Sequence, residues 1–272
     1  MRSIWKGAIT FGLVNVPVKV YSATEDHDVA LHQVHDKDGG RIRYQRRCAV
    51  CGKVVAFENI DKAFDDGERT VVLTKEDLEE LPAGRSREID VVEFVPNEQV
   101  DPLLLDRAYY LEPDSKSSKA YVLLRRTLEA TDRTAIVHFA LRQKTRLGAL
   151  RVRGAVIVLQ SLLWADEVRE ASFTALDEKV RISARELEMS EALVTSFESD
   201  FDPSRFEDDY QVQLRELIEA KLEKGDAVST AETFGEEPED AGGEVLDLME
   251  ALKRSVEKRR SESKPRKPGR SA

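Results

Sequence analysis

The clearest structural signal in this chain is the stretch Val14–Tyr21, which reads VNVPVKVY. Its valines alternate with Asn15, Pro17, Lys19 and Tyr21. This alternation predicts a half-buried β-strand, because successive side chains of a strand point to opposite faces. The apolar positions upstream, from Ile9 to Leu13, have the opposite parity, which predicts a bulge or bend near Gly12. Pro17 predicts an edge position or a strand end.

Downstream of this strand, the pattern is mostly that of β-structure. A turn is expected at Asp36–Gly40, followed by an extended basic ribbon at Arg41–Arg47. Four later segments have strand-like composition: EIDVVEFV (88–95), TAIVHFALR (134–142), TRLGALRV (145–152) and GAVIVLQSLLW (154–164). Many strands and few crossover helices favour a barrel or a mixed antiparallel sheet over a doubly wound fold. The predicted fold class is mostly β with helical additions.

Two helices are expected within this β-rich part. KEDLEEL, Lys75–Leu81, predicts a short helix capped by Thr74 with Asp77 three residues on, and Pro82 ends it. A second helix is indicated by apolar spacing at Ala120, Leu123, Leu124, Thr127 and Leu128.

The character of the chain changes near Ile182. Ala184–Phe197 and Pro203–Lys224 are helical in pattern and acidic, and Gly225 is a natural stop. The second segment carries an apolar stripe made of Phe206, Tyr210, Leu214, Leu217 and Leu222. Asp226–Gly243 has the composition of a linker. After it come a short amphipathic segment, Val245–Val256, and a basic tail that predicts disorder.

The bulk composition predicts a protein of the cytoplasm. No apolar run approaches the length of a membrane span, and the first residues lack the pattern of a signal peptide. The two cysteines are expected to stay thiols in a reducing cytosol. The formal net charge is -10. This overall acidity argues only weakly against an anionic partner, because local charge decides binding at short range.

No catalytic motif is present. The chain lacks the Gly-rich phosphate loops, the H-E-x-x-H zinc motif and the G-x-S-x-G nucleophile motif. Ser117 and Lys119 are interpreted as part of a polar loop before a helix, not as a nucleophile and base. The chain is therefore predicted not to be an enzyme.

The cysteine pair Cys48 and Cys51 has several interpretations. With His32 and His35 it forms H-x-x-H followed by C-x-x-C, which on paper is a four-ligand structural zinc set. If Leu31–Val34 is a strand, however, the two histidines point to opposite faces. A redox pair or two ordinary thiols are the alternatives. No cofactor is expected, and a structural zinc held by His35, Cys48 and Cys51 stays open.

Basic stretches carry the stronger signal. RIRYQRRCAVCGK, Arg41–Lys53, and RQKTRLGALRVR, Arg142–Arg153, contain no acidic residue, and DSKSSK adds Lys116 and Lys119 beside serines. Such density of positive charge is usually explained by an anionic partner, most often nucleic acid. The alternative is that acidic residues of the same chain pair with these cations. Since no recognition helix is evident, contacts to the DNA backbone without base readout are expected.

Three stretches resemble bacterial Ku, the DNA-end-binding family of non-homologous end joining. They are IWKGAITFGLVNVPVKVYSAT (4–24), HQVHDKDGGRIRYQRRC (32–48) and YYLEPDSKSSKAYVLL (109–124). The resemblance implies a β-barrel core with a helical arm. It also implies a homodimer that forms a preformed ring around duplex DNA, closed by a bridge at about residues 23–64.

The resemblance implies a site and partners. It implies that the hole is lined by residues that touch phosphates: Arg41, Arg43, Arg46, Arg47 and Lys53. The basic stretches themselves add further expected DNA contacts: Lys116, Lys119, Arg142, Lys144 and Arg146. The expected partners are double-stranded DNA ends, a second copy of the chain and the ATP-dependent DNA ligase D. No membrane is expected to take part, and the protein is expected on the nucleoid. The ligase-recruiting segment would use Val245, Leu248, Met249 and Leu252.

The implied domains are a barrel core at 1–182, a helical arm at 183–225, and a linker, ligase-recruiting segment and basic tail at 226–272. The stripe Phe206–Leu222 is interpreted either as part of the dimer contact or as packing on the chain's own barrel. A competing function is a zinc-containing nucleic-acid-binding regulator that uses His32, His35, Cys48 and Cys51.

Overall fold

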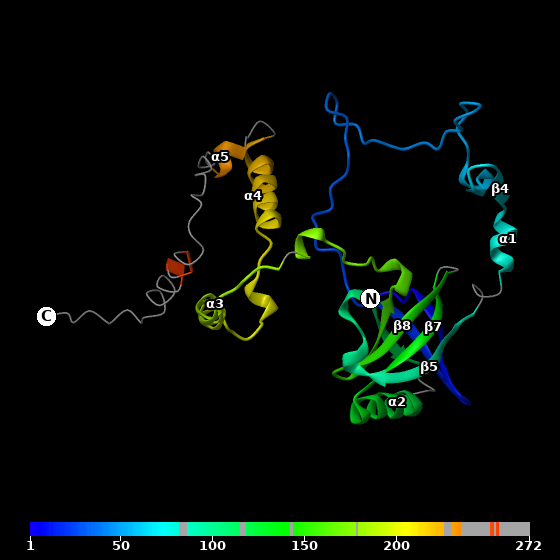
Figure 1. Ribbon diagram of the computed structural model, residues 1–272. Coiled ribbons are helices and arrows are strands. Elements are labelled where there is room, and N and C mark those ends of the chain that lie inside the picture. Colours follow the sequence, from blue (N-terminus) through cyan, green and yellow to red (C-terminus); the bar gives the residue numbers. More distant parts are fainter. Residues whose placement is uncertain are drawn as a thin grey trace. The chain divides into compact units, whose positions relative to one another are not determined.

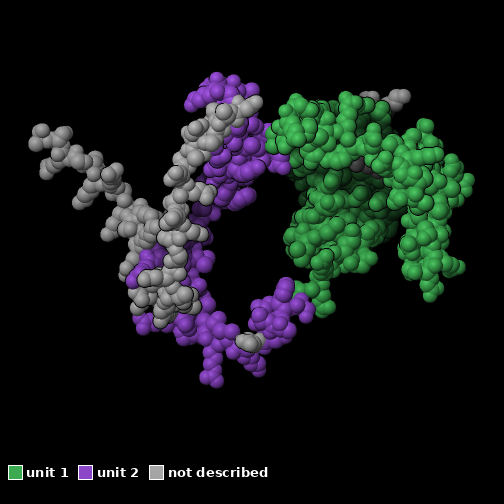
Figure 2. Space-filling model, turned by 90° about the horizontal axis from the view of Figure 1, so that it is seen from above, with its two compact units in different colours: residues 1–27, 31–171 green, residues 28–30, 172–272 purple. Residues whose placement is uncertain are grey.

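The computed structural model describes residues 1–81, 86–114, 118–141, 144–177, 179–225, 230–234, 251–252 and 254–255. The chain divides into two compact units, coloured separately in Figure 2. The first consists of residues 1–27 and 31–171, and the second of residues 28–30 and 172–272.

Within its described residues, the first unit contains a closed seven-stranded barrel (Figure 1). In spatial order the strands are β1 (Trp5–Phe11), β2 (Val14–Ser22), β6 (Leu105–Pro113), β9 (Val156–Leu162), β8 (Lys144–Arg153), β7 (Arg133–Leu141) and β5 (Glu88–Pro96). Neighbouring strands are antiparallel except β1 and β5, whose parallel pairing closes the barrel. The predicted fold class, mostly β around a barrel, is confirmed.

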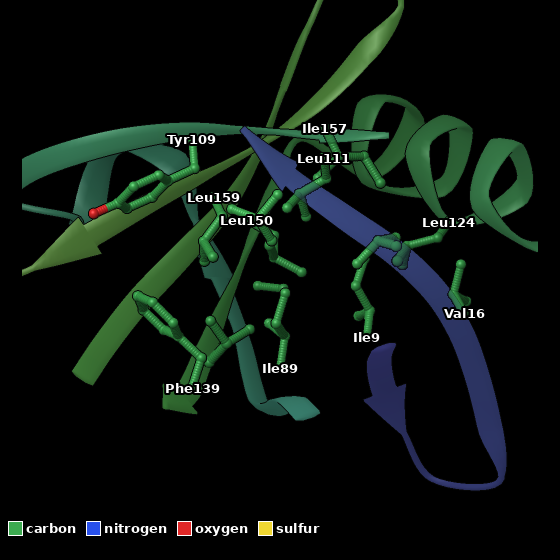
Figure 3. Packing of buried hydrophobic residues seen from close by; sticks show 14 of the residues in the cluster. Ile9, Val16, Ile89, Tyr109, Leu111, Leu124, Phe139, Leu150, Ile157 and Leu159 are labelled. Carbon is green, nitrogen blue, oxygen red and sulfur yellow. The ribbon is translucent and has the colours of Figure 1, made fainter. Parts of the chain in front are cut away.

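The barrel interior is filled with branched apolar side chains (Figure 3). Ile9, Ile89, Leu150 and Ile157 are fully buried there. The helix α2 (Ser118–Thr131) packs against this core through Tyr121, Leu124 and Leu128. The helix itself is confirmed, but Leu123, expected on its apolar face, is 66% exposed. The buried stripe runs through Tyr121, Leu124 and Leu128, and at about 100° per residue Leu123 lies well away from its centre.

Two expectations about the first strand were wrong. Gly12, with a φ of +56°, lies in a tight turn, and the chain reverses there into a hairpin in which Ile9 pairs with Val16. The parity changes because the chain turns back, not because one strand bulges. Pro17 lies in β2, which has neighbours on both sides. It is tolerated because the regular pairing with β6 ends at Val18. Beyond that point the Pro17 carbonyl accepts from the Asp114 N–H at 3.0 Å, a bond that needs no N–H on proline.

Short elements occupy the long connection between β2 and β5. They are the 3-10 turn η1 (Phe57–Asn59), the hairpin strands β3 (Lys62–Asp65) and β4 (Thr70–Leu73), and the helix α1 (Lys75–Glu80). The predicted cap of α1 is confirmed, since the Thr74 hydroxyl accepts from the Asp77 N–H and the Asp77 carboxylate accepts from the Thr74 N–H. The turns η3 (Asn97–Gln99) and η4 (Pro102–Leu104) join β5 to β6.

Helices dominate the second unit. They are α3 (Ala184–Ser196), α4 (Asp209–Lys224) and α5 (Thr230–Phe234), with the turns η6 (Thr174–Leu176) and η7 (Pro203–Arg205); η5 (Ala165–Glu167) precedes them in the first unit. The helix expected from Pro203 starts later, because Asp208 caps α4 by accepting from the Gln211 N–H. Phe206 therefore lies outside the helix. No helix in the described ranges is long and apolar enough to cross a membrane.

Candidate nucleic-acid interface

The segment that carries the first basic stretch is extended and interrupted by two tight hairpin turns. The first reverses the chain between Val34 and Arg41, which form an isolated β-bridge. The His35 N–H donates to the Gly40 carbonyl at 2.8 Å, and Gly39 supports the turn with a φ of +70°. The predicted turn at Asp36–Gly40 is confirmed, and it presents Arg41 at its end.

The second turn contains the two cysteines. Arg47 and Val54 form its β-bridge, and the Val55 N–H donates to the Arg46 carbonyl at 2.8 Å. At its tip the Cys48 N–H donates to the Lys53 carbonyl, and the Gly52 N–H donates to the Cys48 carbonyl, each at 2.9 Å. This bonding fixes the backbone that carries Arg46, Arg47 and Lys53, although no regular strand is present between residues 41 and 55.

All five cations of this stretch are exposed to solvent: Arg41, Arg43, Arg46, Arg47 and Lys53. Within the described part of the chain, none of them forms an ion pair with a carboxylate. The interpretation that acidic residues of the same chain neutralise this stretch therefore finds no support in these residues. Five unpaired cations on a short extended segment make a local positive field in an acidic protein.

One cation missed by the sequence interpretation joins this group. The guanidinium carbon of Arg46 lies 5.1 Å from the centroid of the Phe57 ring, and the ammonium nitrogen of Lys75 lies 5.7 Å from the same centroid. Lys75 looked like an ordinary first-turn helix residue, and nothing in its local sequence links it to Arg46. Only the folded backbone brings the two together.

The basic residues of the barrel are dispersed. Lys119 is exposed in the first turn of α2, and Lys144 is exposed at the start of β8. Arg125, in the middle of α2, donates to the Gly154 carbonyl at 3.1 Å, just beyond the end of β8 that is opposite to Lys144. Arg146 is half-buried, with one guanidinium nitrogen 3.9 Å from an Asp106 carboxylate oxygen. It is therefore less free to meet an outside anion than the cations of residues 41–53.

Comparison with known proteins identifies the family. A family model described as Ku70/Ku80 beta-barrel domain matches residues 10–189. The protein named Non-homologous end joining protein Ku in Leifsonia xyli is 67% identical over 259 residues, covering 95% of this chain and 89% of that protein. The chain belongs to the Ku family.

Other proteins with the same name agree. The one from Mycolicibacterium smegmatis is 58% identical over 96% of this chain and 83% of its own length, and the one from Mycobacterium tuberculosis is 53% identical over 95% and 96%. The resemblance to Ku seen in the sequence is confirmed. The matched span of the family model includes the long connection that carries Arg41–Lys53.

The zinc set considered for this Ku chain is not assembled within the described residues. No group of three or more His, Cys, Asp or Glu side chains there could hold a metal. His35 instead lies beside Asp38, with Nδ1 3.0 Å from a carboxylate oxygen. The Gly40 N–H and then His35 hold the pKa of Asp38 below its usual value. Zinc bound by His32, His35, Cys48 and Cys51 stays an untested prediction.

The two cysteines nevertheless interact. The backbone N–H groups of Cys51 and Val50, followed by the Cys51 thiol, lower the pKa of the Cys48 thiol. Such donors favour the thiolate. The pair thus forms a turn in which the pKa of one thiol is lowered. Its two sulfur atoms could supply at most two of the four ligands of a tetrahedral metal site.

Several predicted site residues lie outside the described residues. They are Lys116, Arg142, Val245, Leu248 and Met249, together with Ser117. Leu252 is described and is half-buried in a short helical fragment. The roles assigned to these positions stay predictions.

Proposed function

We propose that this Ku protein binds the ends of double-stranded DNA in non-homologous end joining, as a homodimeric ring through which the duplex threads. The observation that carries the proposal is a set of five exposed cations between Arg41 and Lys53, none of which forms an ion pair with a carboxylate of the described residues. The relatives of this chain are named for non-homologous end joining. The chain itself is proposed to hold and protect ends, while the chemistry of sealing belongs to a partner.

Phosphate contact explains how such a site works at a break of any sequence. Arginine and lysine contacts to the backbone carry no sequence information. They also allow sliding, because the favourable energy comes from released counterions and is similar at every position along the duplex. A closed ring adds the requirement for a free end, since duplex DNA can enter it only there. In this proposal Arg41, Arg43, Arg46, Arg47 and Lys53 line the ring, and Lys116, Lys119, Arg142, Lys144 and Arg146 add contacts from the barrel.

Exposed apolar surface supports the proposal that the chain forms a homodimer. In the hairpin β3–β4, Phe64, Val71 and Val72 are each more than half exposed, although an isolated two-stranded hairpin is marginal in water. In the second unit the exposed fractions are 70% for Val194 and 80% for Leu222. Single chains rarely leave this much large apolar surface open, and a homodimer would cover it.

The segment after α5 is proposed to recruit the ATP-dependent DNA ligase D. In the sequence, Val245, Leu248, Met249 and Leu252 have the spacing of the apolar face of a helix, and such a helix would suit docking into an apolar groove. The basic residues from Lys258 to Arg270 would add contacts to DNA without sequence preference. The site of action is expected to be the nucleoid of the cytoplasm.

The deciding experiment is a competition for a labelled linear duplex of arbitrary sequence. Unlabelled linear DNA and the same DNA as a relaxed closed circle compete at about 0.15 M salt. The ring predicts that linear DNA competes and the circle does not. Equal competition would overturn threading and make the basic stretch a side-on patch. A preference for one sequence, together with stoichiometric zinc, would support the regulator that was considered as the alternative.

A further inference from the structure

We propose that Arg46, Phe57 and Lys75 act as one phosphate-binding unit, in which the Phe57 ring positions both cations. The inference rests on the proposed DNA binding and adds two residues, Phe57 and Lys75, that no basic stretch contains. The three side chains come from three different elements: the base of the cysteine turn, η1 and the first turn of α1.

The ring of Phe57 is the centre of the unit. Arg46 lies 5.1 Å and Lys75 5.7 Å from its centroid, both within the range of a cation–π interaction. The ring is 69% exposed, so it is not held there by a hydrophobic core. An exposed phenylalanine that contacts two cations has the two cations as its main partners, which makes positioning its simplest role.

Hydrogen bonds hold the chain around Phe57. The Val55 N–H donates to the Arg46 carbonyl at 2.8 Å, and the Asn59 N–H donates to the Ala56 carbonyl at 3.0 Å to shape η1. The Lys75 ammonium donates to the Phe57 carbonyl at 3.5 Å and to the Glu58 carbonyl. Lys75 thus ties α1 to the turn that carries the ring.

Lys75 and Arg46 have hydrogen-bond donors left that can bind an anion. An ammonium has three donors, and Lys75 uses two of them on backbone carbonyls, so one remains. Arg46 has five N–H donors, and no carboxylate pairs with it or with Lys75 in the described residues. Two cations near one ring repel each other, and an anion held close to them offsets that repulsion. A DNA phosphate has the charge and the acceptor oxygens for this.

The neighbouring arginines lack such support. Arg41 and Arg43 have no aromatic ring in cation–π contact among the described residues, so their side chains must be ordered by DNA itself. An ordered cation loses less side-chain freedom on binding. Arg46 is therefore expected to contribute more to DNA affinity than Arg43.

The test measures binding of the full-length protein to a linear duplex over a series of salt concentrations. The variants are Phe57→Leu, Phe57→Tyr, Lys75→Gln, Arg46→Gln and the double variant Arg46→Gln/Phe57→Leu. Phe173→Leu is the matched control, because Phe173 is 64% exposed and contacts no cation in the described residues. Thermal unfolding and dimer mass are measured alongside.

Phe57→Leu should weaken DNA binding about two- to fivefold for each copy of the chain in the dimer. Phe57→Tyr should bind as the unchanged protein does, because tyrosine keeps the aromatic ring that contacts the cations. Arg46→Gln and Lys75→Gln should each lower the salt slope by about one. Adding Phe57→Leu to Arg46→Gln should weaken binding by less than Phe57→Leu does alone, because the ring then positions only Lys75. Phe173→Leu should bind as the unchanged protein does.

The proposal is overturned if Phe57→Leu binds normally, or if its effect simply adds to that of Arg46→Gln. It is also overturned if Phe57→Leu alters dimer mass and leaves the salt slope unchanged, since the anion facing the unit would then belong to the second copy. Failure of the proposed function is a separate result, seen as equal competition by circular and linear DNA in the unchanged protein. The salt slopes of the variants can be read in either case.

Discussion

Gln211 and Val29 lie 182 positions apart, yet the Gln211 Oε1 accepts a 3.0 Å hydrogen bond from the Val29 N–H. The Gln211 Nε2 donates to an Asp28 carboxylate oxygen at 3.1 Å, and the side chain is almost completely buried. Residues 28–30 therefore belong to the second unit, although the chain on either side of them belongs to the first. One buried amide fixes the path of the chain just before the basic segment starts.

Replacing Gln211 by Leu should lower the free energy of unfolding by about 1–3 kcal/mol, because the Val29 N–H and the Asp28 carboxylate lose their partner. Hydrogen exchange should speed up at the Val29 amide. Gln213→Leu, two residues along the same helix and exposed, is the control and should be nearly neutral. Equal effects of the two variants would show that the hydrogen bonds of Gln211 to Val29 and Asp28 do not contribute to stability.

Tyr121→Phe should destabilise the barrel by a similar amount, about 1–3 kcal/mol. The buried hydroxyl donates to the Leu111 carbonyl at 2.6 Å and accepts from the Ile157 N–H at 2.7 Å, and both backbone groups lose this partner in the variant. Chemical denaturation measures the effect. Tyr210→Phe, at an exposed position, should leave the midpoint unchanged.

The Tyr121 hydroxyl also makes the stability of the fold depend on pH. Burial raises the pKa of Tyr121 above its ordinary value of 10.0. The unfolded chain therefore ionises first, and the unchanged protein loses stability as the pH rises above about 10. Tyr121→Phe lacks this loss, so the stability gap between the two proteins should narrow at alkaline pH. If the difference in stability between the two proteins stayed constant from pH 8 to 11, burial would not raise the pKa of Tyr121.

Iodoacetamide should alkylate Cys48 faster than Cys51 near neutral pH in chelator-treated protein. The backbone N–H groups of Cys51 and Val50 lower the pKa of the Cys48 thiol, so a larger fraction of it is thiolate. Peptide mass spectrometry after short labelling measures the order. Faster labelling of Cys51 would argue against the turn geometry. Zinc held by both thiols would protect both of them, which tests the metal in the same experiment.

Charge reversal of Arg43 and Arg46 together should weaken DNA binding and lower the salt slope by about one for each lost phosphate contact. Both residues are exposed, so the fold should tolerate the change. Arg169→Glu/Arg181→Glu makes the same change of net charge at exposed positions outside the basic stretches. If this control reduces binding equally, then net charge explains the loss and residues 41–53 have no special role.

Local patterns in the sequence predicted much of the secondary structure. The helix cap at Thr74 and Asp77, the turn at Asp36–Gly40 and the strands from Glu88 and from residue 134 on follow from spacing and side-chain chemistry within a few residues. The same reasoning failed at Gly12 and Pro17. Whether a chain bends or reverses, and whether a strand has one neighbour or two, depends on residues far away in the sequence.

The sequence by itself determined the family, the β-rich core and the local concentration of positive charge in an acidic chain. Only the tertiary structure decided that β1 and β5 close a barrel, that Gln211 holds Val29 and that Lys75 shares a ring with Arg46. The physical reason is the distance along the sequence over which each kind of interaction acts. Periodicity, caps and charge density are properties of neighbouring residues, whereas these contacts join residues 29 or more positions apart, which only the path of the folded backbone brings together.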